Sequence, residues 1–413
     1  MIGVSEALYK LLSSFSPVAS EVVPLEKAAG RILSEDIKSE IDLPLFTNSS
    51  MDGFAVRAED VERADLKQPV KLFVVEDIPA GKKPTRVLGK NQGSRIMTGA
   101  PIPDGADAVI PIEDTDQYNP ESRSEPGFPK EIEVYRSVEP GDYIRRKGED
   151  ISTHDTVLES NSRLRPQDVG LLAMLGKAKL SVYRRPRIVI LSTGDELLPV
   201  EAPLEFGKIH DSNAYTLSAL ITRDNGDPVY LGIVPDREQA VREFLVESVK
   251  KDADLILSSA GVSVGAFDFV RTVVQSDGVL DFWRVNMRPG KPLAFGNFQG
   301  VPFIGLPGNP VSAFVGYEVF VRSAIRKLAG MNESPRVRIK TKILEDINSD
   351  GRESYLRAVV KSHNGEWIAR LTGHQGSGNL LSLVQANALL IIPSGVKSLP
   401  SGTEVDAWLF DSS

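Results

Sequence analysis

The sequence predicts a multidomain protein in which an α/β domain with a parallel sheet is joined to β-rich modules and to N-terminal helices. Apolar strands alternate with helices between about Arg185 and Ala329, a pattern typical of a parallel sheet covered on both faces. Short strands with Gly, Pro and Asp turns occupy the stretch before it, and five more strands follow from Pro335. The length of 413 residues allows roughly three domains at about 150 residues each.

The first half of the chain contains two textures. Helical spacing predicts helices at Val4–Phe15, Pro24–Leu33 and Leu164–Leu175. From Leu43 to about Gly148 short strands and turns replace the helices, and the polar, Pro-rich stretch from Tyr118 to Lys130 predicts an exposed loop. The strands of this module are expected at Val70–Val75, Ser94–Met97, Ala108–Pro111 and Glu131–Val134.

The second half contains the alternation and then the five final strands. The expected elements of the α/β domain are the strand Arg187–Leu191, the helix Asn213–Arg223, the strand Pro228–Val234, the helix Asp236–Lys251, the strand Asp254–Ser258, the strand Val301–Leu306 and the helix Pro310–Ala329. The strands that follow are short and separated by Gly turns, which predicts a small barrel or sandwich.

Composition excludes several classes of protein. The net charge of −8 argues against a nucleic-acid-binding protein, and no apolar run approaches the ~18 residues of a membrane span. The absence of cysteine excludes disulfides, thiolate metal sites and cysteine nucleophiles, and four histidines make a multi-histidine centre improbable. The N-terminus does not resemble a signal peptide, so the cytoplasm is the expected location.

Three strands of the α/β domain run directly into Gly- or Pro-marked turns: RIVILSTGDEL, DLILSSAGVSVGAFDF and VPFIGLPGNPVSAFV. Ligands of an open parallel sheet bind beyond the carboxyl ends of its strands, where glycines and helix N-termini favour a phosphate-bearing ligand. Asp195, Glu196, Asp236 and Asp268 lie in or beside these loops, where they either cap helices or hold Mg²⁺ between the protein and substrate oxygens.

Gly261–Gly265 also matches the G-x-S-x-G pattern of a hydrolase nucleophile, with Ser263 as the nucleophile. Asp268 and either His363 or His374 would complete the chain order of such a triad. Those histidines belong to the separate C-terminal module, and Asp268 follows the serine too closely. The hydrolase is therefore the weaker alternative.

A second cluster of polar residues lies in the β-rich module. Asp52-Gly53 leads into a strand, and Thr98-Gly99-Ala100-Pro101 is a rigid turn that follows another strand. Ordinary turn chemistry explains either feature alone. Because rigid turns on a scaffold commonly carry function, the two together indicate a second candidate site.

The set NSSMDGFAV, RIMTGAPIPDGADAVI, RKGEDI, STGDEL, DSNAYTL, AGVSVGAFDF, RPGKP and GLPGNPVSAF resembles the MoeA family, the molybdopterin molybdenumtransferases, to which the gephyrin E domain is similar. The likeness extends in order from about Ala7 to Phe410. It implies a helical, discontinuous domain at 1–45 with 149–183, an inserted β-rich domain at 46–148, a molybdopterin-binding α/β domain at 184–330 and a C-terminal β-barrel at 331–413.

The resemblance implies insertion of molybdate into adenylylated molybdopterin, with Mg²⁺ and release of AMP, at a site shared between the subunits of a homodimer. A separate molybdopterin adenylyltransferase is a further partner that it suggests. By motif match, the catalytic residues are Asp52, Thr98, Glu196, Asp236 and Asp268, with Glu196 and Asp268 as metal ligands. The residues expected to bind the pterin, its phosphates or the oxyanion are Arg145, Asp150, Ser212, Asn213, Gly261, Ser263, Gly265, Arg288, Lys291, Pro307 and Pro310.

Two positions depart from the family pattern. Phe54 stands where the family commonly has Tyr, and Ala260 replaces the usual first Gly of its loop, which narrows the backbone freedom there. A non-catalytic scaffold with the same fold, as in the gephyrin E domain, is the second alternative. The intact acids Asp52, Glu196, Asp236 and Asp268 favour the enzyme over the scaffold.

Overall fold

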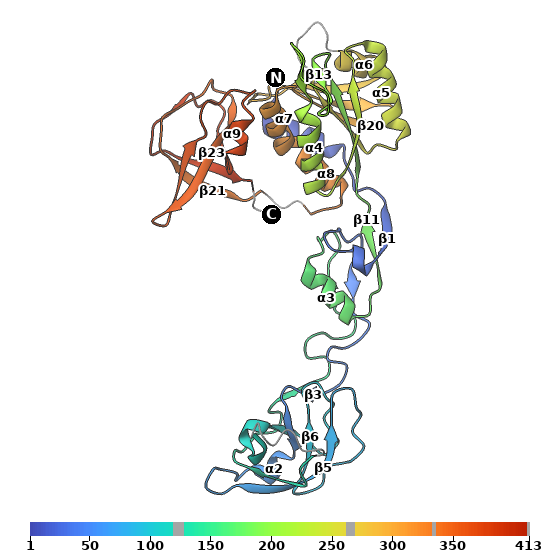
Figure 1. Ribbon diagram of the computed structural model, residues 1–413, viewed down its shortest axis with the longest axis vertical. Helices are drawn as coiled ribbons and strands as arrows, with labels where there is room; N and C mark the ends of the chain where they lie inside the picture. The colour runs from blue at the N-terminus through green and yellow to red at the C-terminus, as the bar shows by residue number, and fades with distance from the viewer. Residues whose placement is uncertain (119–127, 262–268, 333–335, 411–413) are drawn as a thin grey trace. The chain divides into compact units, whose positions relative to one another are not determined.

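A computed structural model describes residues 1–118, 128–261, 269–332 and 336–410 of the chain. Internal contacts divide the chain into two compact units (Figure 1). The first unit comprises Met1–Glu35, Ser160–Ala173 and Lys177–Ser413, and the second comprises Asp36–Glu159 with Met174–Gly176. The second unit is therefore an insertion in the first. No helix among the described residues is long and apolar enough to cross a membrane.

The first unit contains a six-stranded sheet in the order β15-β12-β16-β20-β19-β17. Its parallel strands are β12 (Arg187–Thr193), β15 (Asp227–Val234), β16 (Leu255–Ser259) and β20 (Val301–Leu306), and its antiparallel strands are β17 (Gly278–Arg284) and β19 (Pro292–Phe298). The parallel part confirms the predicted α/β domain. The antiparallel edge was not predicted, because both of its strands carry glycine within irregular apolar runs.

Helices cover both faces of this sheet, as predicted (Figure 1). Alternate residues of β12 point to opposite sides: Ile188 and Ile190 join one core, and Val189 and Leu191 join the other. The first core includes residues of α1 (Val4–Ser13), α4 (Ser212–Arg223), α7 (Pro310–Gly316) and α8 (Arg322–Leu328), and the second includes residues of α5 (Glu238–Lys250) and α6 (Phe269–Asp277).

The predicted helix from Pro310 to Ala329 is one continuous element with a π-helical segment, η5 (Tyr317–Val321), between α7 and α8. The prediction of a helix over Pro24–Leu33 was wrong. Only a 3₁₀ turn, η1 (Leu25–Lys27), forms there, because Pro24 ends strand β1 (Ser20–Pro24) and Gly30 adopts a φ of 76°. Strand β1 pairs with β11 (Lys179–Tyr183), and the predicted third helix is α3 (Pro166–Met174).

The C-terminal strands form a closed barrel, which decides between the barrel and the sandwich that the sequence left open. The order is β23-β24-β21-β27-β25, and β25 pairs back with β23. The bounds are β21 (Arg338–Ile343), β23 (Glu353–His363), β24 (Glu366–Leu371), β25 (Ala388–Ile392) and β27 (Glu404–Leu409). Strand β18 (Met287–Arg288) pairs with β23 and so joins the α/β domain to the barrel.

The second unit is a five-stranded sheet in the order β7-β4-β6-β5-β8. These strands are β4 (Gly53–Val56), β5 (Val70–Ile78), β6 (Gln92–Ile96), β7 (Ala108–Pro111) and β8 (Glu131–Val134), beside the short helix α2 (Ala58–Val61). Gly53 is required at the start of β4, since a Cβ atom there would lie 1.9 Å from the carbonyl oxygen of Ile110. Phe54, one of the two departures from the family pattern, is buried in the core of this sheet.

The remaining elements are short. They are β2 (Ile37–Lys38), β3 (Asn48–Ser49), η2 (Ile112–Asp114), η3 (Asp116–Tyr118), β9 (Ile144–Arg145), β10 (Thr156–Leu158), β13 (Leu197–Leu198), β14 (Ile209–His210), β22 (Ile347–Asn348), α9 (Leu381–Val384) and β26 (Ser398–Leu399).

Candidate functional site

A cavity of about 970 Å³ lies at the carboxyl ends of the parallel strands of the first unit. Strand β12 is first in the chain, and β15 and β16 lie on opposite sides of it, so the cavity is at the topological switch point where such sheets bind ligands. Its lining includes eight of the residues proposed from the sequence: Glu196, Ser212, Asn213, Gly261, Arg288, Lys291, Pro307 and Pro310.

The N-terminus of α4 forms one wall of the cavity. Asp211 caps this helix by accepting a hydrogen bond from the Ala214 amide at 3.1 Å, and its other oxygen accepts one from the Tyr230 hydroxyl at 3.0 Å. Burial and the Asp211 carboxylate raise the pKa of Tyr230 above its usual value, so this hydroxyl stays protonated and donates. The cap leaves Ser212 at the cavity, where the helix N-terminus favours an anion.

Asn213 has a role that the sequence did not suggest. Its side-chain amide donates to Ser259 Oγ at 2.8 Å and to the carbonyl oxygen of Gly308 at 2.7 Å. The amide nitrogen therefore ties the end of β16 to the loop after β20. Asn213 acts on the shape of the cavity, and its Nδ2 protons are already used within the protein.

The loops after β12 and β15 place acids at two distances from the cavity. Glu196 lines it, whereas the carboxylate of Asp236 accepts a hydrogen bond at 2.5 Å from the hydroxyl of Thr193, which does line it. Asp236 thus lies behind the cavity wall. Nor is Asp236 the N-cap of α5, because that position belongs to Arg237.

The loop after β16 adopts a backbone conformation that favours glycine. Ala260 has a φ of 97° and Gly261 a φ of 73°, and both line the cavity. A residue with a Cβ atom is strained at positive φ, which agrees with the restriction expected where Ala260 replaces a glycine. Ser263, Gly265 and Asp268, further along this loop, lie outside the described residues.

Cationic side chains also line the cavity. Arg288 and Lys291 belong to a turn with Gly290 at a φ of 103°, and Arg352 joins them from the barrel. Arg352 donates to the carbonyl oxygen of Met287 at 3.1 Å and pairs with Asp350. The hydrogen bond from Arg352, helped by the charge of Arg288, holds the pKa of Asp350 below its usual value.

Sequence reasoning missed the barrel's contribution to the cavity, which is Arg352 and the loop Gln375–Gly378. This loop is fixed by Arg357, whose fully buried guanidinium donates to the carbonyl oxygens of Gln375 at 3.3 Å and Gly376 at 2.9 Å. Burial, with a smaller effect of Arg288, lowers the pKa of Arg357 to about 10, so it remains a cation near neutral pH. The Gly-rich run HQGSGN was the available signal for this loop.

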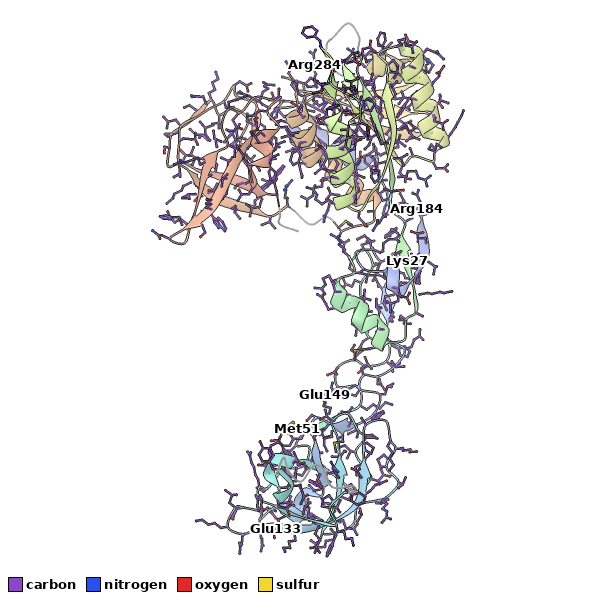
Figure 2. The ribbon with its side chains drawn as sticks, in the orientation of Figure 1. Lys27, Met51, Glu133, Glu149, Arg184 and Arg284 are labelled. Carbon is purple, nitrogen blue, oxygen red and sulfur yellow. The ribbon has the colours of Figure 1, made fainter. Side chains whose placement is uncertain are left out.

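The second unit brings Asp52 and Thr98 together, as the paired turns suggested. Asp52 Oδ1 accepts hydrogen bonds from the backbone amide of Thr98 at 2.7 Å and from its hydroxyl at 2.8 Å. Both residues are exposed. In Figure 2 the neighbouring Met51 lies at one end of this unit and Glu133 at the opposite end.

Arg145 and Asp150 form an ion pair within the second unit. Strand β9, which contains Arg145, pairs with β3 at Asn48, so the ion pair lies beside the segment that leads to Asp52. Both side chains are about half exposed, and their contact is with each other. This placement supports a role in holding the chain segments that enter the unit.

The donor set for a metal is small. No group of three His, Asp or Glu side chains that could hold a metal ion occurs within the ranges that the structure describes. Glu196 is an exposed carboxylate on the cavity wall. Mg²⁺ commonly takes one or two protein carboxylates and completes its shell with substrate phosphates and water, so the residues fit a metal that arrives with the substrate.

The hydrolase alternative gains little from the described residues. His363 ends β23 at the turn into β24, and its register partner is Glu366. His374 lies in the loop before Gln375, and its Nδ1 accepts a hydrogen bond from the Gly376 amide at 3.0 Å. That nitrogen is therefore engaged in holding the loop.

Comparisons with known proteins cover nearly the whole chain. The MoeA N-terminal region (domains I and II) matches residues 2–176, the probable molybdopterin binding domain matches 189–327, and the MoeA C-terminal region (domain IV) matches 340–410. A molybdopterin molybdenumtransferase of Nostoc is 38% identical and one of Bacillus subtilis is 36% identical, with 94% and 99% of this chain covered and 88% and 94% of theirs. The crystal structure of a molybdopterin biosynthesis moeA protein from Pyrococcus horikoshii OT3 has a TM-score of 0.82 at 33% identity, covering 99% of this chain and all of that one. These names favour the transferase over the scaffold and the hydrolase.

Proposed function

Because the chain belongs to the MoeA family and is a molybdopterin molybdenumtransferase of molybdenum cofactor biosynthesis, we propose that it inserts molybdate into adenylylated molybdopterin and releases AMP. The observation that carries this proposal is the pairing of two walls in one cavity. Cationic side chains line the same cavity as a helix N-terminus and glycine-containing loops. The first suits a small oxyanion and the second suits a phosphate.

The cationic wall binds molybdate in this proposal. Arg288, Lys291 and Arg352 supply the charge, and guanidinium groups match the geometry of oxyanions through paired N–H donors. Arg357 fixes the loop Gln375–Gly378 by donating hydrogen bonds to carbonyl oxygens of that loop. Positioning of this kind matters for catalysis, since a displacement of about 1 Å can cost a hundredfold in rate.

The helix N-terminus and the loops after β16 and β20 bind the phosphates and the pterin in this proposal. Ser212 and the free amides at the start of α4 face an anion, and Gly261 lets the backbone approach it. Pro307 and Pro310 rigidify the loop after β20. Ser263, Gly265 and Asp268 belong to this part of the proposal through the resemblance of their motif.

Glu196, with Asp268, would hold Mg²⁺ against the substrate phosphates. When bound, the ion would neutralise charge that develops on the phosphates as the anhydride breaks. Asp236 supports this part of the site indirectly, by holding Thr193 at the cavity.

The cytoplasm remains the proposed location, in keeping with the absence of cysteine.

Asp52 and Thr98 supply the second half of the site in this proposal. They lie in the inserted unit, and we propose that in a homodimer they act at the cavity of the other subunit. An exposed carboxylate that is already oriented by two hydrogen bonds suits this role, because it needs little further ordering. Arg145 and Asp150 support that unit.

The direct test is release of AMP from adenylylated molybdopterin in the presence of Mg²⁺ and molybdate. We expect AMP release to depend on both additions and to accompany molybdenum transfer to the pterin in equal amount. AMP release without molybdenum transfer, at the same rate with or without molybdate, would contradict the proposal. Parallel reactions with tungstate measure which oxyanion is preferred.

A further inference from the structure

A second cavity, of about 620 Å³, lies in the first unit and shares no lining residue with the first. It is bounded by α1, by η5 and α8, and by the first and last strands of the barrel. Its lining is strongly basic: the residues are Leu8, Leu12, Glu318, Val319, Arg322, Ser323, Arg326, Lys327, Met331, Arg336, Arg338 and Trp408. The proposed reaction uses none of them.

The two carboxylates beside this cavity already accept hydrogen bonds from arginine side chains. Glu318 is fully buried, and its two oxygens accept hydrogen bonds from Arg223 at 2.7 Å and Arg336 at 2.6 Å. Burial opposes its ionisation, but the two arginines outweigh that effect and hold the pKa of Glu318 below its usual value. The negative charge of Glu318 is therefore already neutralised by two arginines.

Asp224 is used in the same way. One oxygen accepts from Arg223 at 2.7 Å and from the Tyr317 hydroxyl at 2.9 Å, and the other accepts from Arg322 at 3.3 Å. The side chain of Asp224 is 3% exposed, so water adds little to its bonding. Asp224 and Glu318 together therefore form ion pairs with three arginines.

Three donors of the lining are left over. Arg326 makes no side-chain hydrogen bond or ion pair with any described residue, and it lies one turn of α8 after Arg322. Arg336 is nine-tenths buried, and its Nε has no partner within the described chain. Among the described residues, Lys327 bonds only the carbonyl oxygen of Leu12, at 2.9 Å.

Among the described residues in or beside this cavity, six basic side chains stand against two acids, an excess of four positive charges: Arg223, Arg322, Arg326, Lys327, Arg336 and Arg338 against Asp224 and Glu318. Burial and the charge of Arg322 lower the pKa of Arg326, as expected for a cation crowded by its own kind. Partly buried charge that is not compensated costs free energy, and a bound anion removes that cost.

We propose that this cavity binds a small polyanion with at least two adjacent phosphate groups, such as a free diphosphate or the diphosphate of a nucleotide. Arg326 and Arg336 Nε provide unused donors, and guanidinium groups bind phosphate oxygens through paired bonds. The volume is within the range of ordinary small-molecule sites. The ligand would contact both α8 and Arg336 next to β21, and so it would bridge the α/β domain and the barrel.

The test is titration calorimetry of inorganic pyrophosphate into the full-length protein at low ionic strength. Lys291→Gln serves as the background, because it weakens anion binding in the first cavity. On that background we expect Arg326→Gln to weaken pyrophosphate binding by about tenfold or more. Arg242→Gln, which removes a surface arginine paired with Glu238, is the matched control and should leave binding unchanged.

Thermal unfolding separates this role from a structural one. Without anion, Arg326→Gln should unfold at the same temperature as the background protein or higher, since an uncompensated charge is removed. The rise in Tm caused by pyrophosphate should be lost in that variant. Titration with ADP distinguishes the sources: tighter binding than pyrophosphate indicates a nucleotide, and weaker binding indicates a free diphosphate.

Two outcomes would overturn the proposal. The first is a pyrophosphate affinity that Arg326→Gln leaves unchanged, and the second is a rise in Tm that sodium chloride reproduces at equal ionic strength. Failure to bind pyrophosphate at all would overturn it as well. None of these outcomes depends on the transferase reaction.

Discussion

The two units fix the turns that carry their candidate residues in different ways. In the second unit a carboxylate accepts two hydrogen bonds from one threonine: Asp52 from Thr98 at 2.7 and 2.8 Å, and Asp42 from Thr153 at 2.8 and 2.9 Å. In the first unit the amide of Asn213 and the guanidinium of Arg357 bind backbone carbonyl oxygens. Carboxylates titrate in mild acid, whereas amides and guanidinium groups do not. The contacts of Asp52 and Asp42 should therefore be more sensitive to acid than those of Asn213 and Arg357.

The largest expected effect tests whether catalysis needs residues of both units. Asp52→Ala and Glu196→Ala should each lower turnover by at least about a hundredfold, because each removes charge from a proposed half-site. Mixed and allowed to exchange subunits, the two variants should recover up to about half the wild-type activity per heterodimer, since one site then carries neither substitution.

The control is a chain with both substitutions, mixed with wild type under the same conditions. Its heterodimers have a substitution in each shared site and should be inactive. Activity per wild-type chain should therefore fall as heterodimers form. Undiminished activity in that mixture, or no recovery from the single variants although heterodimers form, would place a complete site in each subunit.

A smaller effect tests the cationic wall. Arg352→Gln removes one guanidinium from the cavity, and we expect tungstate, as a molybdate analogue, to bind about tenfold more weakly. Equilibrium dialysis measures the dissociation constant. Arg370→Gln, an exposed arginine on the same barrel, should leave it unchanged. Equal losses of tungstate affinity in both variants would show that the effect comes from the overall charge of the protein and not from the position of Arg352.

The contrast in acid sensitivity can be measured at Asp42. Hydrogen bonds from the Thr153 amide and hydroxyl hold its pKa below the usual value, so its contribution to stability is present above the unfolded pKa of about 4 and is lost as pH falls through the folded value. Asp42→Asn should therefore have a lower urea midpoint than wild type at pH 6, and the difference should shrink as pH falls below about 4.

Asp104→Asn is the control in the same unit, since its exposed carboxylate makes no hydrogen bond with the described residues. Its urea midpoint should follow that of wild type throughout. A midpoint difference at Asp42 that persists unchanged in acid would assign the loss to packing and not to the charge.

The smallest expected effect concerns Ala260, at a φ of 97°. Ala260→Gly should raise the free energy of unfolding by up to about 1 kcal/mol, because relief of strain outweighs the greater freedom of glycine in the unfolded chain. Ala240→Gly in α5 should lower it by about 1 kcal/mol, since its backbone is helical. Chemical denaturation of both variants measures whether each substitution raises or lowers the free energy of unfolding.

Sequence reasoning succeeded where the pattern is local. Strands β7 and β20 begin and end where predicted, because each is a short apolar run between turn residues. It failed over Pro24–Leu33, where apolar spacing looked helical but Gly30 and pairing with distant segments decided the structure. Tertiary pairing overrides local propensity in such segments.

The candidate site divides in the same way. Residues at strand ends, such as Glu196 and Pro307, could be placed because the carboxyl ends of parallel strands share one edge. Arg352 and the loop Gln375–Gly378 could not, since nothing in their own spacing shows that the barrel returns to the α/β domain. The role of Asp236 behind Thr193 likewise depends on a side-chain direction that sequence does not reveal.

The cavity wall also has a consequence for biogenesis. The lining begins at Thr193 and ends at Gly378, so a ribosome adding about 5–20 residues per second needs roughly 10–40 seconds to pass from the first lining residue to the last. Throughout that interval the nascent α/β domain lacks Arg352 and the loop that Arg357 holds. A growing chain therefore lacks part of the cationic lining that is proposed to bind molybdate until the barrel has emerged and closed.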